Sequence, residues 1–168
     1  MPAATNSFSP ERNLRTRVAQ IADVDAIARL INTAFVVERI AFDGDRINAP
    51  GVVELLNKGA FLLGEDAAGL AGCVYVEVRG ARSYLGLLSV DPARQNTGLG
   101  RWLVAAAEDY SRKAGCDAMD LRIISPRAES LLPFYQHLGY IETGTAPFSS
   151  DLKPKVPCHY ITMVKQLT

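Results

Sequence analysis

The sequence has few of the residues that build disulfide frameworks or metal sites. Its three cysteines, Cys73, Cys116 and Cys158, are far apart and form no CxxC pair, so neither a disulfide-stapled domain nor a zinc ribbon is expected. With two histidines, His137 and His159, a multi-histidine metal centre is not expected either. We therefore predict a protein that binds no metal and resides in a reducing compartment, the cytoplasm.

Long apolar runs and an excess of charge are also missing. No segment approaches the roughly 20 apolar residues that span a bilayer, and residues 1–13 are polar rather than arranged as a signal peptide. Lys plus Arg number 18 and Asp plus Glu number 18, so the formal net charge is zero. We therefore expect neither a membrane nor a nucleic-acid partner, although a local basic site for one small anion remains open.

The residues that are present suit one globular domain. The chain has 168 residues, of which 48% are hydrophobic and 21% charged. This length provides a core without covalent staples. We predict a flexible N-terminal tail over residues 1–13 and a single domain over residues 14–168.

Hydrophobic periodicity predicts an α/β (α+β) fold, a mixed sheet wrapped by about four helices in the order βααβββαβαββ. The predicted strands span residues 15–21, 60–64, 69–79, 83–90, 118–124, 140–143 and 159–165. The predicted helices span residues 23–35, 48–59, 98–114 and 130–138. Asp23 is expected to cap the first helix, because its carboxylate can accept the free N–H groups of the first turn.

The segment from Leu85 to Leu103, LGLLSVDPARQNTGLGRWL, is the most informative one. It reads as a strand, a short turn, and glycines at the start of a helix. A helix N-terminus offers unpaired N–H groups and the positive end of the helix dipole, and the missing side chains of Gly98 and Gly100 let an anion approach. Arg94 and Arg101 flank this point. The residues alone therefore predict a phosphate or pyrophosphate site.

Known phosphate motifs can be compared with this segment. A dinucleotide GxGxxG would need a glycine where Leu103 stands, and the chain contains no GxxxxGK. The run Gln95-Asn96-Thr97-Gly98-Leu99-Gly100 instead matches the (Gln/Arg)-x-x-Gly-x-(Gly/Ala) signature of the GNAT superfamily of N-acetyltransferases. The segment Leu132–Tyr140, LPFYQHLGY, resembles the family's aromatic-Tyr-x-x-x-Gly-aromatic segment. Together with the element order, the resemblance covers residues 15 to 165.

The resemblance implies a mostly antiparallel sheet with splayed central strands and acetyl-CoA as cosubstrate. The pyrophosphate would rest on the N–H groups of the glycine loop, and the pantetheine arm would pair with the backbone of the preceding strand. A backbone N–H near Leu88 would polarise the thioester carbonyl. The expected cofactor-binding residues are Leu88, Ser89, Val90, Arg94, Gln95, Asn96, Thr97, Gly98, Leu99, Gly100, Arg101 and Tyr135.

Tyr135 matches the tyrosine that protonates the departing thiolate in this family. The chemistry is reasonable, because a phenol with a pKa of about 10 can protonate a thiolate whose thiol has a pKa of about 8.5. The same residue also lies on an apolar stripe with Leu131, Phe134 and Leu138, so a purely structural role in the core is the alternative. The family often has an asparagine seven residues earlier, where this chain has Ala128.

A general base must take a proton from the incoming ammonium. The strand before the glycine loop contains no acid, so Glu77 on the neighbouring strand is the candidate, on the same face as Tyr75. A solvated charge pair with Arg79 is the structural alternative. Glu38, Asp43 and a chain of water molecules are the other candidates for the proton acceptor.

The resemblance implies an enzyme that moves acetyl from acetyl-CoA to a primary amine by direct attack in a ternary complex. The acceptor pocket would be formed by Val36–Asn48, the strand face of Tyr75 and Glu77, and Thr145–Pro157. A small metabolite amine is the preferred acceptor, and a peptide or protein amine the second choice; the chain is compatible with a homodimer. The alternatives are an acyl-CoA-binding sensor or interaction module and, more distantly, a nucleotide-phosphate protein.

Overall fold

One seven-stranded sheet organises the chain, which is seen here in a computed structural model that describes residues 14–168. The strand order is β1-β2-β3-β4-β5-β7-β6, and every neighbouring pair is antiparallel except β4 and β5. The predicted fold class is thus confirmed. The predicted tail over residues 1–13 lies outside the described residues. No helix in the described part is long and apolar enough to cross a bilayer.

The elements follow the predicted order. The strands are β1 (Arg15–Val18), β2 (Ala60–Asp66), β3 (Gly69–Arg79), β4 (Arg82–Val90), β5 (Ala118–Ile124), β6 (Ile141–Pro147) and β7 (His159–Gln166). The α-helices are α1 (Val24–Ala34), α2 (Ala49–Leu56), α3 (Leu99–Lys113) and α4 (Ala128–His137). The 3-10 turns are η3 (Ile21–Asp23), η4 (Phe35–Ile40), η5 (Pro92–Arg94) and η6 (Ser125–Arg127).

The sheet has a separate apolar core on each face. On one face, α3 and α4 pack on a cluster that includes Val74, Val76 and Leu121. On the other, α1 and α2 pack on a cluster that includes Cys73 and Tyr75. Because successive strand residues point to opposite faces, β3 contributes to both cores, as its alternating sequence predicts.

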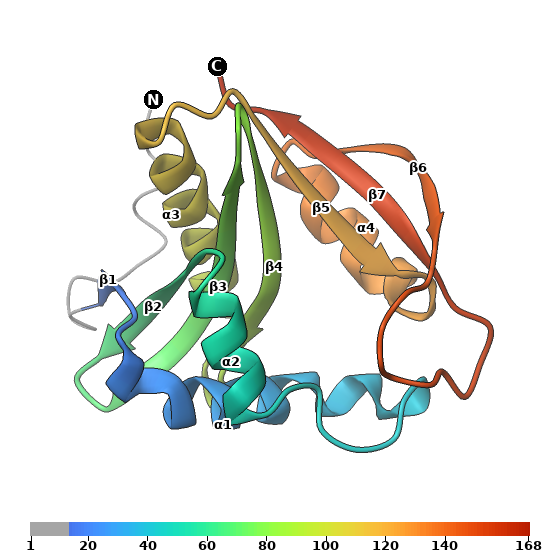
Figure 1. Cartoon of the computed structure of the whole chain (residues 1–168), viewed down its shortest axis with the longest axis horizontal. Helices are drawn as coiled ribbons and strands as arrows, with labels where there is room; N and C mark the ends of the chain where they lie inside the picture. The colour runs from blue at the N-terminus through green and yellow to red at the C-terminus, as the bar shows by residue number, and fades with distance from the viewer. Residues whose placement is uncertain (1–13) are drawn as a thin grey trace.

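The centre of the sheet splays open. Pairing between β4 and β5 is confined to three residue pairs at one end and stops at Tyr84 and Asp120. Beyond that point β5 continues along β7, and the two halves of the sheet diverge like the arms of a V in Figure 1. The backbone of β4 from Leu85 to Val90 therefore has a strand partner on its β3 side only.

Several local predictions are wrong. The first strand ends at Val18 instead of residue 21, and β6 continues to Pro147 instead of ending at residue 143. The Asp23 carboxylate does not cap α1, because η3 precedes the helix and turns this side chain back toward the Gln20 N–H (2.7 Å) and the Arg17 guanidinium (2.7 Å). The fourth helix begins at Ala128 and not at residue 130, so Pro133 lies inside the helix rather than near its start. The early start follows η6, whose turn leads directly into α4.

Candidate active site

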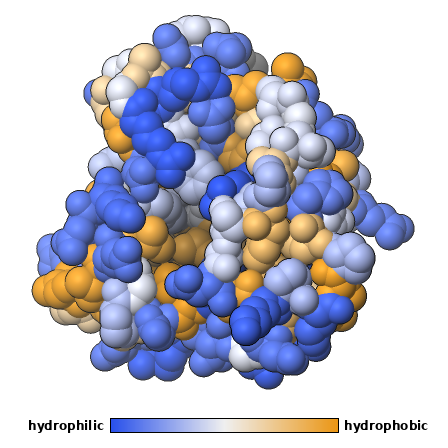
Figure 2. Space-filling view, turned by 45° about the vertical axis from the view of Figure 1, so that its right-hand side comes forward, coloured by the Kyte–Doolittle hydropathy of each residue, from blue (hydrophilic) through white to orange (hydrophobic). Residues whose placement is uncertain are grey.

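A cavity of about 1190 Å³ opens in the splay between β4 and β5. Its walls come from β3, β4, β5, the start of α3, α4, η4 and the loop between β6 and β7. The space-filling view in Figure 2 shows a surface hollowed near its centre, with hydrophilic and hydrophobic residues around the hollow. The candidate site is therefore one continuous space that reaches both faces of the opened sheet.

Most of the predicted site residues line this cavity. They are Glu77, Leu88, Val90, Arg94, Gln95, Asn96, Gly98, Leu99, Gly100, Arg101 and Tyr135. Two predicted residues do not line it. The hydroxyl of Ser89 is turned to the Leu87 carbonyl (2.9 Å), and that of Thr97 to the Arg94 carbonyl (2.5 Å). Both side chains thus stabilise the backbone beside the cavity.

The glycine loop has the backbone conformation that its sequence favours. Asn96 and Gly98 both lie in the left-handed region, with φ of 63° and 87°, and Gly98 is the N-cap of α3. Asparagine and glycine are the residues that adopt this conformation most readily. A side chain at Gly100 would meet its nearest neighbour, Phe134, only at an ordinary contact distance of 3.6 Å. Gly98 is therefore required by the turn, whereas Gly100 keeps space open at the first turn of α3.

Arg94 and Arg101 have different surroundings. Arg94 binds both oxygens of Asp66 (2.8 and 2.9 Å) and one oxygen of Asp91 (2.6 Å), which ties the β2–β3 turn to the glycine loop. Although burial alone would raise the pKa of Asp66, hydrogen bonds from Arg94 and the Ala68 N–H hold this pKa below its usual value. Arg101 is exposed on the cavity wall, with no carboxylate within ion-pair distance among residues 14–168. Of the two, Arg101 is the cation available to a phosphate.

The strand before the loop contains a bulge at the middle of the splay. Cys73 pairs with Ser89 and Tyr75 with Gly86, so one residue of β3 faces two residues of β4. Leu87 has a φ of 51°, an uncommon conformation for a branched side chain. Bulges and residues with a positive φ change the direction of a strand's N–H and C=O groups, and they occur frequently next to functional sites.

Tyr135 belongs to the core and to the cavity at the same time. Its ring packs edge-on against Phe134 (4.9 Å between centroids) and Tyr140 (5.8 Å), and it also lines the cavity. Burial, and secondarily the neighbouring Tyr84, raise the pKa of Tyr135 above its usual value, which Arg127 only partly offsets. The phenol therefore stays protonated at neutral pH and can act as a proton donor.

The three carboxylates considered as bases differ sharply. Glu77 accepts hydrogen bonds from the Arg79 guanidinium (2.6 Å) and the Tyr75 hydroxyl (2.7 Å), and these contacts hold its pKa below the usual value. Glu38 is buried on the cavity wall, and burial raises its pKa. Asp43 is exposed, pairs with Lys155 (3.1 Å) and does not line the cavity.

Glu38 also has two cations close to it. The guanidinium groups of Arg127 and Arg46 lie 3.7 and 4.0 Å from its two carboxylate oxygens. They counteract part of the desolvation without restoring the usual pKa. Because Arg127 also influences Tyr135, the candidate acid and this carboxylate have a common neighbour.

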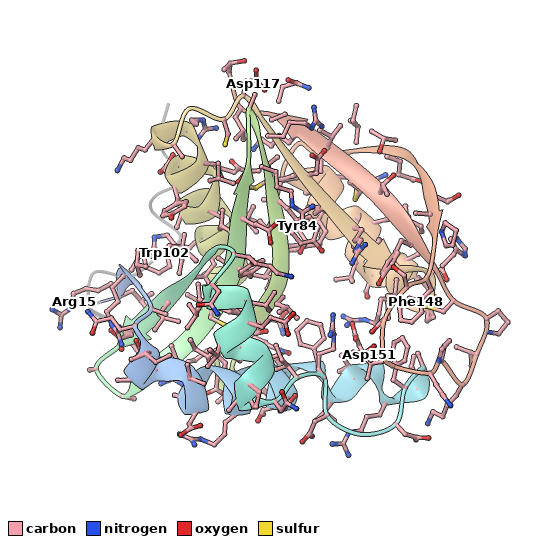
Figure 3. All side chains as sticks on the ribbon, in the orientation of Figure 1. Arg15, Tyr84, Trp102, Asp117, Phe148 and Asp151 are labelled. Carbon is pink, nitrogen blue, oxygen red and sulfur yellow. The ribbon has the colours of Figure 1, made fainter. Side chains whose placement is uncertain are left out.

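The two loops predicted to form the acceptor pocket meet in the structure. Phe42 stacks on Phe148 (5.3 Å), which in turn packs against Tyr160 (5.2 Å). Phe42 also bridges to Pro154 through the backbone. Figure 3 shows Phe148 and Asp151 on the β6–β7 loop across the opening from Tyr84. These three rings line the cavity and join the segment after η4 to the β6–β7 loop.

Sequence reasoning missed Arg122, Arg127 and Tyr84. Arg122 sits in β5, where its neighbours Leu121 and Ile123 point into the core, and its guanidinium lies 4.0 Å from the centroid of the Tyr160 ring. The only sequence feature that could have indicated Arg122 is its position between two apolar residues of a strand, where it must point to the other face of the sheet. Its partner ring, however, lies far along the chain, and no local pattern predicts that contact.

No cysteine or histidine lines the cavity within the described part of the chain. Cys73 is fully buried in the core below it, and burial raises the pKa of its thiol to about 12. Cys73 is therefore not available at this cavity as a thiolate nucleophile.

Comparisons with known proteins agree with this geometry. Residues 25–140 match the model of the acetyltransferase (GNAT) family. A mycothiol acetyltransferase from Clavibacter michiganensis is 39% identical over 71 residues, which are 42% of this chain and 23% of that protein. The chain thus matches less than a quarter of the length of this relative.

Solved structures share the fold at low sequence identity. The ribosomal-protein-S18-alanine N-acetyltransferase of Escherichia coli is 18% identical with a TM-score of 0.72, covering 92% of this chain and 94% of that one. Ard1 from Thermoplasma volcanium is 16% identical with a TM-score of 0.76 over 91% and 97% of the two chains. The protein yncA from Salmonella typhimurium, solved with its cofactor acetyl-CoA, is 22% identical with a TM-score of 0.69 over 92% and 94%.

Proposed function

Since this chain belongs to the acetyltransferase (GNAT) family, we propose that it transfers an acetyl group from acetyl-CoA to the primary amine of a small molecule. The proposal rests on one observation: the glycine loop, the unpaired edge of β4 and Tyr135 all border the same cavity. A binding surface for one phosphate alone would not need the last two.

The residues present fit acetyl-CoA, which supplies the acetyl group as a thioester. The N–H groups from Gln95 to Arg101 lie at the start of α3, where the helix dipole favours an anion. The free edge of β4 offers Leu88 and Val90 for strand-like pairing with an amide-containing arm. Arg101 supplies a cation that no carboxylate neutralises among the described residues.

The bulge in β4 and Tyr135 account for the chemistry of the donor. We place the backbone N–H of Leu88 against the thioester carbonyl, where it would stabilise the negative charge that develops on the oxygen. Tyr135 would donate its phenolic proton to the departing thiolate. The phenol is protonated at neutral pH, but its raised pKa makes it a weaker acid, so the transfer would depend on its placement beside the sulfur.

For the proton of the acceptor ammonium we keep two carboxylates. Glu77, the residue predicted from the sequence, faces the cavity but is a weak base, because Arg79 and Tyr75 stabilise its anion. Glu38 is the stronger base, because burial destabilises its anion. We therefore assign the proton-accepting role to Glu38 and treat Glu77 as its competitor.

A small acceptor is supported by the contact between two segments at one side of the cavity. The stacked rings of Phe42 and Phe148 join the two loops there. A second support is the partial match to an enzyme named mycothiol acetyltransferase.

The test combines turnover with binding. Thiol release from acetyl-CoA is measured over a panel of small amines, and CoA binding is measured by calorimetry. We expect tight CoA binding and thiol release that depends on one class of amine and yields its acetylated product. CoA binding without acceptor-dependent thiol release would contradict the proposal and favour a binding module.

A further inference from the structure

The cavity is lined by a set of arginines that differ in their partners. Six line it: Arg46, Arg79, Arg94, Arg101, Arg122 and Arg127. Four of these have a carboxylate within 4.0 Å. Within residues 14–168, Arg101 and Arg122 have none. Arg101 stands at the glycine loop and is explained by the cofactor, whereas Arg122 is not.

Arg122 lies on the face of the sheet that is turned away from α3. Its strand neighbours Leu121 and Ile123 are buried in the core under α3 and α4. Its own side chain contacts Tyr84, which packs with the α1 cluster on the opposite face. The residue is therefore placed on the side of the cavity bordered by η4 and the β6–β7 loop, opposite the glycine loop.

The guanidinium of Arg122 is held in position without being neutralised. It lies 4.0 Å from the ring centroid of Tyr160 and 5.9 Å from that of Tyr84. Tyr160 is itself fixed by its hydroxyl bond to the Ser149 carbonyl (3.0 Å). Stacking on an aromatic face fixes the plane of a guanidinium and leaves its N–H fork available. Asp151, an exposed residue of the cavity rim, does not come within ion-pair distance.

The remaining charges on this side leave an excess of positive charge. Glu77 is paired with Arg79, and the single carboxylate of Glu38 lies between Arg46 and Arg127. Neither acid faces Arg122 at contact distance. Arg122 is exposed, so its guanidinium is open to a ligand that brings its own negative group.

We propose that Arg122 binds a carboxylate of the acceptor, so that the enzyme acts on amines that carry a carboxylate, such as amino acids. The inference rests on the proposed function and narrows it. A planar guanidinium recognises a carboxylate through two parallel hydrogen bonds, which provides both orientation and affinity. Holding the acceptor by its carboxylate would direct its amine toward the thioester.

The test compares matched acceptors and matched variants. Thiol release is measured on the full chain with L-amino acids and with the corresponding amides, in which the carboxylate is neutral. We expect the wild type to prefer the acids by about ten-fold or more in kcat/KM, because a hydrogen bond to a charged group is lost with the amide. Arg122→Gln should abolish this preference while the KM for acetyl-CoA stays unchanged, and Arg122→Lys should keep part of it. The control is Arg15→Gln, an exposed arginine on β1 outside the cavity.

Two results would overturn the inference. One is an active Arg122→Gln enzyme with an unchanged ratio of acids to amides. The other is a raised KM for acetyl-CoA in this variant, which would assign Arg122 to the cofactor. Calorimetric binding of an amino acid to the CoA-bound protein gives a readout independent of turnover. If no amine releases thiol, the proposed function fails, but weaker amino-acid binding by Arg122→Gln would still support the carboxylate site and equal binding would refute it.

Discussion

The two sides of the cavity are built by different means. On the α3 side, the site consists of backbone groups: the start of a helix, a left-handed glycine and a strand edge without a partner. On the α1 side it consists of side chains, among them Glu38, Tyr84, Arg122 and Phe148. A site made of backbone groups depends little on the identity of its side chains, whereas a site made of side chains depends on each of them. The cofactor half should therefore tolerate substitution of single side chains better than the acceptor half.

The largest expected effect comes from removing the proton donor, which acts where the two halves of the cavity meet. Tyr135→Phe should lower kcat by about a hundred-fold, because general acid catalysis contributes on the order of 10² to 10⁴. CoA affinity and thermal stability should change little, since the ring and its contacts with Phe134 and Tyr140 remain. Steady-state kinetics and calorimetry of CoA binding check this. A folded variant with undiminished turnover would leave Tyr135 with its structural role alone.

The next effect separates the two carboxylates. A base with a raised pKa makes kcat/KM rise with pH in a higher range than a base with a lowered pKa, because each acts only when deprotonated. Glu38→Gln should remove this rise of kcat/KM with pH and lower kcat/KM by roughly ten-fold or more. Glu77→Gln, the matched control on the same cavity, should keep the rise that is due to Glu38. Deprotonation of the acceptor's own ammonium also makes kcat/KM rise with pH, and both variants retain that rise. If only Glu77→Gln removes the rise of kcat/KM with pH, the base is Glu77, the residue predicted from the sequence.

A third comparison uses the two arginines of the cofactor half. Arg101→Gln should raise the KM for acetyl-CoA a few-fold and leave stability unchanged, because it removes only a cation near the phosphates. Arg94→Gln should lower the free energy of unfolding by about 1 kcal/mol, because it leaves Asp66 and Asp91 without their partner. Because the folded-state pKa of Asp66 is lowered, this stabilisation is present above the carboxyl's unfolded pKa and is lost as pH falls through the folded one. Thermal unfolding against pH and kinetics together check the pair.

The smallest effect concerns the closure of the acceptor half. Phe148→Leu should raise the KM of the acceptor a few-fold, because it removes the stacking with Phe42 and Tyr160 that joins two loops, an interaction of about 1 kcal/mol. The KM for acetyl-CoA should stay as it is. A variant that loses both affinities equally would show that the two halves are not independent.

The same difference explains what the sequence could predict. The bounds of β3 and β5 were predicted to the residue, because alternation and flanking Gly, Arg and Asp residues mark them locally. The glycine loop was found for the same reason, since its conformation depends on Asn96 and Gly98 themselves. Backbone sites leave a contiguous signal of this kind.

The acceptor half left no such signal. The sequence presented Glu38 as one acid of a polar connection, and only the folded chain buries it between Arg46 and Arg127. Likewise, the stacking of Arg122 on Tyr160 joins two strands whose pairing depends on the whole sheet. Glu77 is the exception, because the hydrogen bonds that lower its pKa come from Tyr75 and Arg79, each two residues away on the same face of β3. Strand alternation already indicated these neighbours, and pairing with Arg79 was the structural alternative.

The central claim is that the opened sheet holds the reacting atoms between these two halves. A crystal structure of the protein with bound CoA tests it most directly. We expect the pyrophosphate on the N–H groups from Gln95 to Arg101, the pantetheine along β4, and the sulfur within hydrogen-bonding distance of the Tyr135 hydroxyl. A CoA whose sulfur lies outside the cavity, or whose arm leaves the edge of β4 unpaired, would contradict it.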